Sequence, residues 1–468
     1  MKSPSAFGRQ NNMNSLIKKY NAPVPRYTSY PPANYFKDPF PAKNYLDAVK
    51  KSNNWEPESV SLYFHIPFCR KMCFYCGCNS CPLPDKKTVD NYFEALKSEL
   101  LLVTGLIDKN RKVSQVHFGG GTPNSVPSGY MTQLMDLLHE NFAFSPSPEI
   151  AIECNPAYLD INYIKQLIRA GFNRFSLGIQ DFSEQVLKGV NREPSSIPVK
   201  DIVSFLRAES PYAKVNMDFI YGLPGQTTGS FLNTIEKAAG INPDRLVTFS
   251  YAHVPWVNKA QEKLEKRGLP GNEEKAAMYR KASDLLIENG YKAIGLDHFV
   301  LEKDELYQAL QSGRLHRNFQ GYCTRNTTGQ VYAFGVSAIS QLRGVYAQNT
   351  KLVDEYIVSL SKGLIPTRKG YVLSRPEIII REVITELMCN KMLIWASLAK
   401  QLKSTLPEIM ETINYDRKLL NQFKEDGIID FTDDYVKITG KGSLFIRNVA
   451  ASFDPLMAEG NKKFSRSF

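Results

Sequence analysis

Long apolar runs are missing from this sequence of 468 residues. The longest, such as Leu100–Val103 and Ile378–Ile380, are far shorter than the roughly 20 residues that a membrane-spanning helix needs. The first residues, MKSPSAFGRQNNMNSLIKKY, contain no apolar stretch of the kind found in signal peptides. We therefore expect a cytoplasmic protein without a membrane partner.

Dense runs of one charge are also absent, although 58 Lys and Arg against 47 Asp and Glu give a formal charge of +11. The excess is spread along the chain in short runs such as Lys109–Lys112. Nucleic-acid binding usually concentrates basic residues on one element. The pattern favours a solvated basic surface and no nucleic-acid partner, and an acidic small-molecule substrate would also fit it.

Cysteine is sparse over most of the chain, where Cys154, Cys323 and Cys389 stand alone. The other five of the eight cysteines fall between residues 69 and 81. A secreted disulfide framework would spread its cysteines over a shorter chain. In a reducing compartment, such a group indicates metal binding.

A regular alternation of short apolar runs and amphipathic stretches begins near residue 61. The expected strands are Ser61–Ile66, Gln115–Phe118, Ile150–Glu153, Arg174–Ile179, Val215–Tyr221 and Leu246–Tyr251. The expected helices between them include Val89–Leu106, Gly129–Glu140, Leu159–Ala170 and Ser230–Ala239. The alternation predicts a parallel sheet with right-handed crossovers.

Polar residues stand at the carboxyl end of many of these strands rather than of one or two. They are His65, Gly119–Thr122, Glu153, Gln180, Asp218 and His253. An open sheet would concentrate function at a switch point, whereas a barrel collects it around one rim. We therefore expect an α/β fold with a full or partial (β/α) barrel.

The two ends of the chain depart from this pattern. Residues 1–55 are rich in Pro, Asn, Lys and Tyr, and we expect an arm with little regular structure beside a barrel domain over 56–370. Residues 371–468 predict a small, mostly α-helical domain that can have a winged-helix shape. Its expected helices are Arg375–Asn390, Ile394–Ser404 and Leu406–Asp426, followed by a hairpin over Ile428–Thr439.

Three cysteines with the spacing C-x3-C-x2-C follow the first expected strand: Cys69, Cys73 and Cys76. Thiolates are the usual protein ligands of a [4Fe–4S] cluster, and three of them leave one iron open for the amine and carboxylate of a small molecule. Zinc is the chief alternative, but structural zinc sites usually take two close pairs that are far apart in sequence. The crowding into one loop favours the cluster.

Other residues at the expected rim could hold a ligand beside the cluster. The turn Gly119–Pro123 lets backbone amides approach a carboxylate closely. Carboxylate, amide and guanidinium groups at Glu153, Gln180, Arg192 and Asp218 could contact ribose hydroxyls, an ammonium or a carboxylate. Any one of these residues, taken alone, would more often form a structural salt bridge or hydrogen bond. The hypothesis of a ligand site therefore depends on their shared position at one rim.

Together these motifs resemble the oxygen-independent coproporphyrinogen III oxidases, radical S-adenosylmethionine enzymes of haem biosynthesis. The resemblance covers nearly the whole chain and rests on Pro25–Pro31, Tyr63–Cys69, Cys73–Asn79, Phe118–Pro123, Gly178–Phe182, Val190–Arg192, Asp218–Pro224, Tyr251–His253, Asp297–Phe299, His316–Tyr322 and Gly335–Ser340. It implies a partial (β/α) TIM-like barrel of the radical type, an amino-terminal arm over the site and a small carboxy-terminal domain.

The resemblance also implies the cofactors, which are a [4Fe–4S] cluster on Cys69, Cys73 and Cys76 and two S-adenosylmethionine molecules. By position, the residues lining the cluster-bound molecule would be Tyr63, Gly120, Glu153 and Ile339. Those lining the second would be Tyr75, Gly121, Thr122, Gln180, Arg192, Asp218 and Ala252. Tyr63 and Cys78 would be catalytic, with Cys78 beside the site but not an iron ligand. Tyr75 departs from the family's Phe, and Cys81 has no assigned role.

The activity implied is oxidative decarboxylation of coproporphyrinogen III to protoporphyrinogen IX by way of a 5′-deoxyadenosyl radical. We expect a monomer that uses an unidentified electron donor and acceptor. Because the substrate carries four carboxylates, we hypothesise that Arg26 and Arg317 contact it. Two alternatives are a haem-trafficking chaperone, whose type lacks Arg26–Tyr30 and the Cys78 position, and a radical enzyme that modifies haem itself.

Overall fold

A twelve-stranded sheet forms the centre of the computed structural model, which describes residues 13, 15–325, 329–413, 415–458, 462 and 464–465. Neighbouring strands run parallel through its middle, in the order β1 (Val60–Ile66), β4 (Val113–Gly120), β5 (Phe144–Cys154), β6 (Arg174–Gln180), β7 (Lys214–Tyr221) and β8 (Arg245–Ser250). The predicted strands and their parallel order are therefore confirmed.

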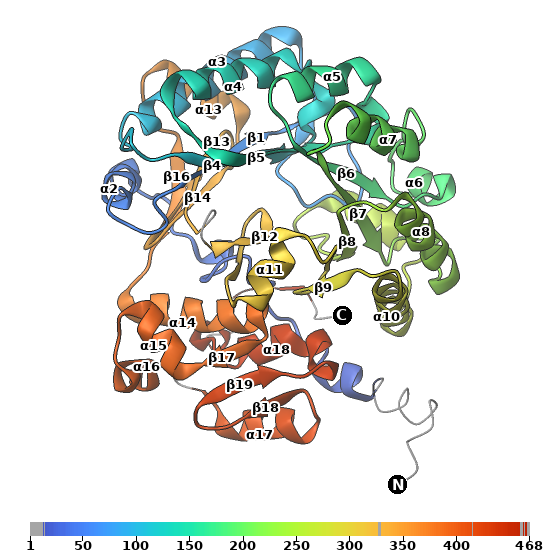
Figure 1. Ribbon diagram of the computed structural model, residues 1–468, viewed down its shortest axis with the longest axis vertical. Coiled ribbons are helices and arrows are strands. Elements are labelled where there is room, and N and C mark those ends of the chain that lie inside the picture. Colours follow the sequence, from blue (N-terminus) through green and yellow to red (C-terminus); the bar gives the residue numbers. More distant parts are fainter. Residues whose placement is uncertain are drawn as a thin grey trace.

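Helices cover the outer face of this curved sheet (Figure 1). They are α3 (Lys86–Thr104), α4 (Gly129–Asn141), α5 (Ile161–Arg169), α6 (Glu184–Gly189), α7 (Val199–Glu209), α8 (Thr228–Ile241) and α10 (Asn272–Glu288). Side-chain caps begin several of them, as where Asp85 accepts from the Thr88 amide at 2.8 Å. Strand β1 is buried at six of its seven positions, so side chains on both of its faces are covered.

Short strands extend both edges of the parallel core. On one side lie β13 (Val331–Phe334), β14 (Ile339–Leu342), β15 (Val345–Asn349) and β16 (Thr367–Val372), and on the other β10 (His298–Val300) and β9 (Lys292–Ile294). In the described part of the chain β16 and β9 do not pair with each other, so the barrel is partial, as the resemblance implies. Between these edges run α11 (Glu305–Gln311), β11 (Leu315–Asn318) and β12 (Gly321–Thr324).

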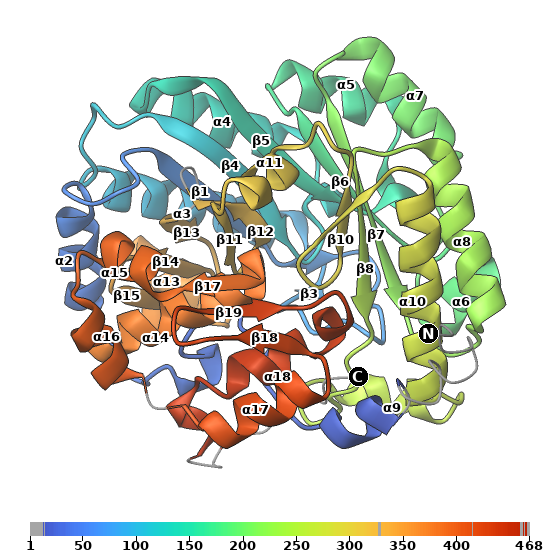
Figure 2. The same cartoon turned by 60° about the horizontal axis from the view of Figure 1, so that its bottom comes forward.

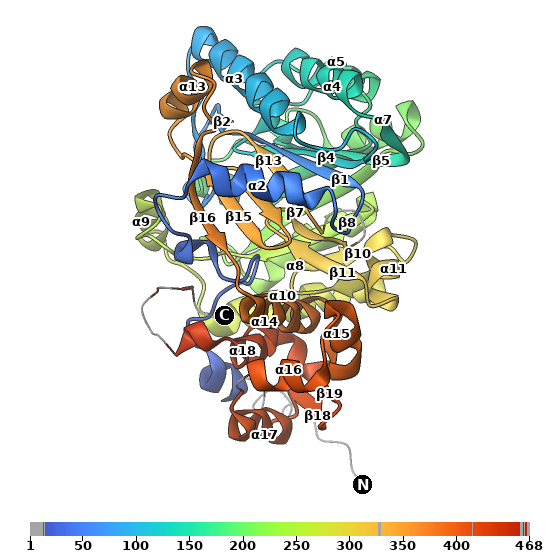
Figure 3. The same ribbon diagram turned by 90° about the vertical axis from the view of Figure 1, so that its left-hand side faces the viewer.

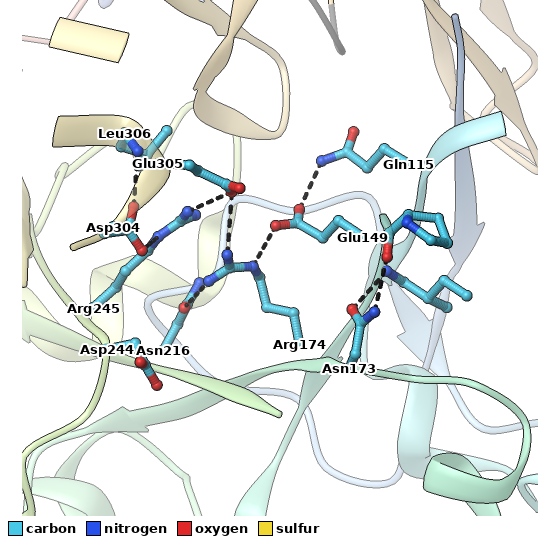
Figure 4. A network of polar contacts seen from close by, with 12 residues as sticks. Gln115, Glu149, Asn173, Arg174, Asn216, Asp244, Arg245, Asp304, Glu305 and Leu306 are labelled. Atoms are coloured by element: carbon cyan, nitrogen blue, oxygen red, sulfur yellow. Dashed lines mark hydrogen bonds and ion pairs between the residues drawn. The ribbon is translucent and has the colours of Figure 1, made fainter. Parts of the chain in front are cut away.

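A buried network of charged residues joins the amino ends of the parallel strands to the start of α11 (Figure 4). Arg245, the first residue of β8, lies 2.8 Å from Asp304 and 2.8 Å from Glu305. Arg174, the first residue of β6, lies 2.5 Å from Glu149 and 3.2 Å from Glu305. The network fixes the end of the barrel that lies opposite the strand ends carrying the cysteine loop.

The arm is more regular than the sequence predicts. Residues 42–52 form helix α2 (Ala42–Ser52), which lies against β14, β15 and β16 (Figure 3). Tyr45, Ala48 and Val49 recur at helical spacing and are buried in the barrel core. The prediction of little regular structure is therefore wrong for these residues, because this amphipathic stretch packs its apolar side against the edge strands of the sheet. Residues 1–12 of the predicted arm lie outside the described residues.

The carboxy-terminal part packs as a second core below the barrel (Figure 2). Its helices are α14 (Arg375–Thr385), continued by a π-helical turn over Glu386–Asn390, α15 (Trp395–Leu402), α16 (Leu406–Thr412), α17 (Arg417–Glu425) and α18 (Ile446–Ala451). The predicted hairpin is confirmed as β18 (Ile429–Phe431) and β19 (Tyr435–Ile438), and β17 (Met392–Ile394) joins it as an unpredicted third strand. The single helix expected over 406–426 is wrong, because Asp416 caps a new helix by accepting from the Lys418 amide.

The two cores share the arm. Leu16, Ile17 and Tyr20 pack into the carboxy-terminal core, as do Tyr27 and Tyr30, whereas α2 belongs to the barrel core. The boundaries between arm, barrel domain and carboxy-terminal domain, placed at 55/56 and 370/371, stay a prediction. No helix among the described residues is long and apolar enough to cross a membrane.

Candidate active site

The cysteine loop leaves β1 and is closed at its base by a short strand pair. Strand β2 (Phe68–Cys69) pairs with β3 (Cys81–Pro82), and the Cys81 amide donates to the Pro67 carbonyl at 2.9 Å. Cys81 therefore has a structural place that the sequence did not indicate, at the neck of the loop. The neck holds residues 69–81 as one compact excursion at the carboxyl end of the first barrel strand.

Residues from distant parts of the chain fasten the tip of this loop. Asn191 donates to the Met72 carbonyl at 2.8 Å, and Asn258 donates to the Cys76 carbonyl at 2.7 Å. Gln261 donates to the Tyr75 carbonyl at 3.0 Å. These bonds come from the segments after β6 and β8, so the barrel rim fixes the loop on two further sides.

The three thiols face polar groups of the rim. The Thr122 hydroxyl lies 3.4 Å from Cys69 Sγ, and an Arg192 guanidinium nitrogen lies 3.7 Å from Cys73 Sγ. The Cys78 amide donates to Cys76 Sγ at 3.4 Å. Burial raises the pKa of the Cys69 thiol to about 11, whereas hydrogen bonds from Cys78 lower the pKa of Cys76. Bound iron would supply the positive charge that keeps all three as thiolates.

One cavity of about 410 Å³ gathers the residues predicted for the cluster-bound S-adenosylmethionine. Tyr63, Gly120, Glu153 and Ile339 all line it, and so does Cys78. The Gly120 amide donates to a Glu153 carboxylate oxygen at 3.3 Å. These four residues come from β1, β4, β5 and β14, which lie close together in the sheet although they are far apart in sequence.

Two histidines that were not assigned a role organise this cavity. His65 Nε2 lies 2.8 Å from the Asn79 carbonyl, which can only accept, so the neutral ring receives the Tyr63 hydroxyl at Nδ1 over 3.1 Å. Burial lowers the pKa of His65, which keeps that neutral form. His117 donates to Glu153 at 3.0 Å. Strand alternation could have indicated His117, because it pairs directly with Tyr63 across β1 and β4.

The residues predicted for a second S-adenosylmethionine are less closely grouped. Arg192 lies 3.3 Å from the Tyr75 hydroxyl and also donates to the Gly178 carbonyl, two residues before Gln180. Gly121 and Thr122 border Cys69. Ala252 instead lines a separate cavity of about 380 Å³, beside His253.

Two buried polar groups of this second set suit a ligand. Gln180 has a left-handed backbone with φ of 69°, and its buried Oε1 has no hydrogen-bond partner in the part of the chain that the structure describes. Burial raises the pKa of Asp218 to about 6, although Ser176 donates to it at 2.8 Å. An unmet acceptor and a buried carboxyl are groups that ribose hydroxyls could satisfy.

The glycine turn approaches the cysteine loop too closely for any side chain. A Cβ added at Gly121 would lie 2.5 Å from the Pro67 carbonyl oxygen and 3.1 Å from Cys69 Sγ. We expect Gly121→Ala to lower the free energy of unfolding by about 1–3 kcal/mol, because backbone must move to admit the methyl group. Displacement of Cys69 should also lower the iron content per chain after anaerobic reconstitution.

Gly129→Ala is the matched control for this substitution. A Cβ at Gly129, the first residue of α4, meets nothing within 4 Å. Its iron content and thermal midpoint should equal those of the wild type or exceed them slightly. Equal iron content and stability in Gly121→Ala would contradict the close approach.

The donors present fit a [4Fe–4S] cluster with S-adenosylmethionine. Three thiols share one loop, a side-chain-free glycine turn faces them, and Gln180 offers an unmet acceptor. Among the described residues no three His, Cys, Asp or Glu side chains gather closely enough around one point to hold a single ion. A cluster needs no such point, because its thiolates bind separate irons.

Arg26 and Arg317, the hypothesised substrate contacts, lie side by side away from the cysteine loop. Arg317 donates to the Arg26 carbonyl at 2.7 Å, and Arg26 donates to the Ser250 carbonyl at 3.0 Å. Both line a cavity at the end of β8. The structure thus joins the two arginines but places them in a different cavity from Tyr63.

A partial barrel with a three-cysteine loop after its first strand is the architecture of radical S-adenosylmethionine enzymes. Residues 63–238 match the sequence profile of the Radical SAM superfamily. That segment contains the cysteine loop, the glycine turn and the strands that carry Glu153, Gln180 and Asp218.

Curated relatives match over nearly the full length of the chain. The oxygen-independent coproporphyrinogen III oxidase of Synechocystis sp. is 38% identical, over 97% of this chain and 97% of its own. Its counterpart in Escherichia coli is 38% identical over the same shares, 97% and 97%. A solved structure of coproporphyrinogen III oxidase from Escherichia coli aligns with a TM-score of 0.86 at 37% identity, covering 95% of this chain and 98% of that one. The chain belongs to the oxygen-independent coproporphyrinogen III oxidases.

Proposed function

We propose that this protein decarboxylates coproporphyrinogen III oxidatively to protoporphyrinogen IX without oxygen. The observation that carries the proposal is the match to the named oxidases along the whole chain, arm and carboxy-terminal part included, and not only along residues 63–238. The cysteine loop with its adjoining cavity supplies the chemistry that such a reaction needs.

Each round converts one propionate into a vinyl group. One hydrogen atom leaves the carbon attached to the ring, CO2 leaves the neighbouring carbon, and one further electron passes to an acceptor. Two rounds give the product. When bound, the cluster with S-adenosylmethionine supplies the one-electron chemistry that removes the hydrogen atom.

The residues of the chain hold and orient the reactants in this proposal. Cys69, Cys73 and Cys76 would hold the cluster through their thiolates, and the Glu153 carboxylate could accept a hydrogen bond from the amine of S-adenosylmethionine. Tyr63 is fixed by the neutral His65, whose other nitrogen binds the backbone beside Cys78. Tyr63 and Cys78 both line the cavity, and this chain of bonds holds their segments next to each other, which supports a catalytic role for both.

Several finer points belong to the same proposal. Two S-adenosylmethionine molecules take part, with Gln180, Arg192 and Asp218 among the contacts of the second. The enzyme acts as a cytoplasmic monomer with a separate electron donor and acceptor. Buried polar groups that face the barrel interior, such as Asp218 and Gln180, support the second molecule.

An anaerobic assay tests the function. Reconstituted protein, a reductant, S-adenosylmethionine and coproporphyrinogen III should yield protoporphyrinogen IX and CO2 in a ratio of about one to two, because two propionates are lost per product molecule. Cleavage of S-adenosylmethionine without any CO2 would disprove the substrate and spare the radical chemistry. Consumption of haem in place of coproporphyrinogen would favour a haem-modifying enzyme.

A further inference from the structure

A small cavity surrounded by basic side chains lies where the arm, the barrel and the carboxy-terminal core meet. It measures about 80 Å³, and its walls include Arg26 of the arm, Lys275 of α10, Arg317 of β11 and Arg447 of α18. Asp297 is the one carboxylate among the residues that line it. Four cations therefore face a single anion in a largely buried space.

Backbone carbonyls, not carboxylates, hold these cations in place. Arg26 donates to Ser250 O at 3.0 Å, Lys275 to Tyr251 O at 3.0 Å, and Arg317 to Arg26 O at 2.7 Å. Within the described ranges, none of these three forms a salt bridge, and Asp297 is held by His298 at 2.7 Å. The charge of Asp297 acts on Arg26 and Arg317, but one carboxylate does not balance four buried cations, so the cavity is electrostatically incomplete.

The pKa shifts of the cations agree with this imbalance. Burial, with the charges of Arg26 and Arg447, lowers the pKa of Lys275 to about 8. Burial, with the charges of Arg26 and Arg317, lowers the pKa of Arg447 to about 9. The same uncompensated field would stabilise an anion placed among them.

A neutral group completes the set of donors. Thr248 lines the cavity and is only 1% exposed, and its buried hydroxyl has no hydrogen-bond partner among the described residues. The same part of the chain provides no partner for the buried Arg317 Nε. Both are hydrogen-bond donors, and a carboxylate could accept from both.

The position of the cavity limits which carboxylate could enter. Thr248 and Ser250 belong to β8, whereas the cysteine loop follows β1, and four strands lie between these two in the sheet. The cavity is too small for a macrocycle but shares Arg26, Ser250, Lys275 and Arg447 with the neighbouring space of about 380 Å³. A side chain could thus reach in from there while the ring stays outside.

We propose that this cavity binds a carboxylate of the substrate that is not decarboxylated, with Lys275, Arg447, Arg317 and Arg26 as its charged contacts and Thr248 as a neutral donor. The inference rests on the proposed function, because it takes the substrate to be a tetracarboxylate. It assigns Lys275, Arg447 and Thr248 a part in substrate binding, and it gives the carboxy-terminal core a direct role in specificity.

Binding of coproporphyrin III, the oxidised and unreactive form of the substrate, tests the proposal on the reconstituted holoenzyme. Lys275→Gln should raise the Kd about tenfold or more, since a charge-assisted hydrogen bond is lost. Lys275→Arg should stay within a few-fold of the wild type. Lys281→Gln, at an exposed position on the same helix α10, is the matched control and should leave the Kd unchanged.

Two further measurements make the outcome decisive. The neutral tetraamide of coproporphyrin III should bind the wild type and Lys275→Gln equally, because it carries no anion. The Kd for S-adenosylmethionine should not change; a fall in that affinity alone would mean that the cavity holds the carboxylate of S-adenosylmethionine and would overturn the proposal.

Failure of the inference differs from failure of the proposed function. If the wild type converts coproporphyrinogen III and Lys275→Gln and Arg447→Gln bind coproporphyrin III as tightly as the wild type, the carboxylate site is disproved and the function stands. If the wild type neither binds nor converts it, the function itself fails. Iron content and circular dichroism equal to wild type establish that a variant is folded.

Discussion

Cys69→Ala protein, reconstituted without oxygen, should hold no [4Fe–4S] cluster and should lose decarboxylase activity by about a thousandfold or more, because one of three protein ligands is gone. Cys73→Ala and Cys76→Ala should behave alike, since Cys69 ends β2 and the other two thiols lie in the loop that joins β2 to β3. Iron and sulfide per chain, the absorbance of the cluster and CO2 release measure the effect.

Two cysteines on the same loop provide the controls. Cys81 sits in the strand pair at the neck, so Cys81→Ala should keep its iron and most of its activity. Cys78→Ser should keep its iron but lose turnover, because Cys78 lines the cavity with Tyr63 without being a ligand. Iron lost from Cys78→Ser and retained in Cys76→Ala would mean that the third ligand has been misassigned.

Arg245→Met should lower the free energy of unfolding by about 3–5 kcal/mol, because it leaves the buried carboxylate of Asp304 without its cation. The Asp304 side chain is only 2% exposed and lies 2.8 Å from Arg245 (Figure 4). Among the described residues, the Leu306 amide, at 2.9 Å, remains as a hydrogen-bond donor to Asp304 after the substitution. Chemical unfolding followed by circular dichroism measures the loss.

Two further variants separate the loss of a charge pair from the loss of packing. Arg417→Met removes an exposed salt bridge to Asp433, with side chains 63% and 82% exposed, and should change stability far less. Arg245→Met combined with Asp304→Leu should recover much of the loss, because no unpaired charge remains. A double variant as unstable as Arg245→Met alone would contradict this explanation.

The network should also make the free energy of unfolding depend on pH in the acidic range. Burial alone would raise the pKa of Asp304, but Arg245 outweighs it and holds the pKa below its usual value. A carboxyl group whose pKa is lower in the folded state than in the unfolded state stabilises the protein at any pH above its unfolded-state pKa. That stabilisation is lost as the pH falls through the folded-state pKa. The stability of Arg245→Met should therefore fall less on acidification than that of the wild type.

The parallel core and the cysteine loop could be predicted because their signals are local. Strand β1 alternates apolar residues with Ser61, Tyr63 and His65, and the spacing C-x3-C-x2-C lies within eight residues, so neither signal depends on distant partners. Strands β9 and β10 have three residues each and are stabilised by pairing, which a short sequence window does not contain. Helix α2 was missed because the prolines that directly precede it, Pro39 and Pro41, obscured the start of an amphipathic stretch.

The arrangement of the site was harder to predict from the sequence than the identity of its residues. Glu153 and Tyr63 could be named from motifs, but the place of His117 depends on the register between β1 and β4, which pairs it with Tyr63. The basic cavity is a stronger case, because Lys275 and Arg447 lie in no recognisable motif and only the fold brings them to Arg26. Long-range geometry of this kind has no signature in a single sequence.

The meeting of the arm with the carboxy-terminal core also sets an order of events during translation. Arg317 is made 291 residues after Arg26, and Arg447, which donates to the Pro25 carbonyl, follows that residue by 422. At about 5–20 residues per second, the arm waits roughly 20 to 80 seconds for this partner. A chain interrupted before residue 447 would still contain the cysteine loop and could take up iron, yet it would lack a wall of the basic cavity. Radical chemistry would then be available in a nascent chain before the complete substrate site exists.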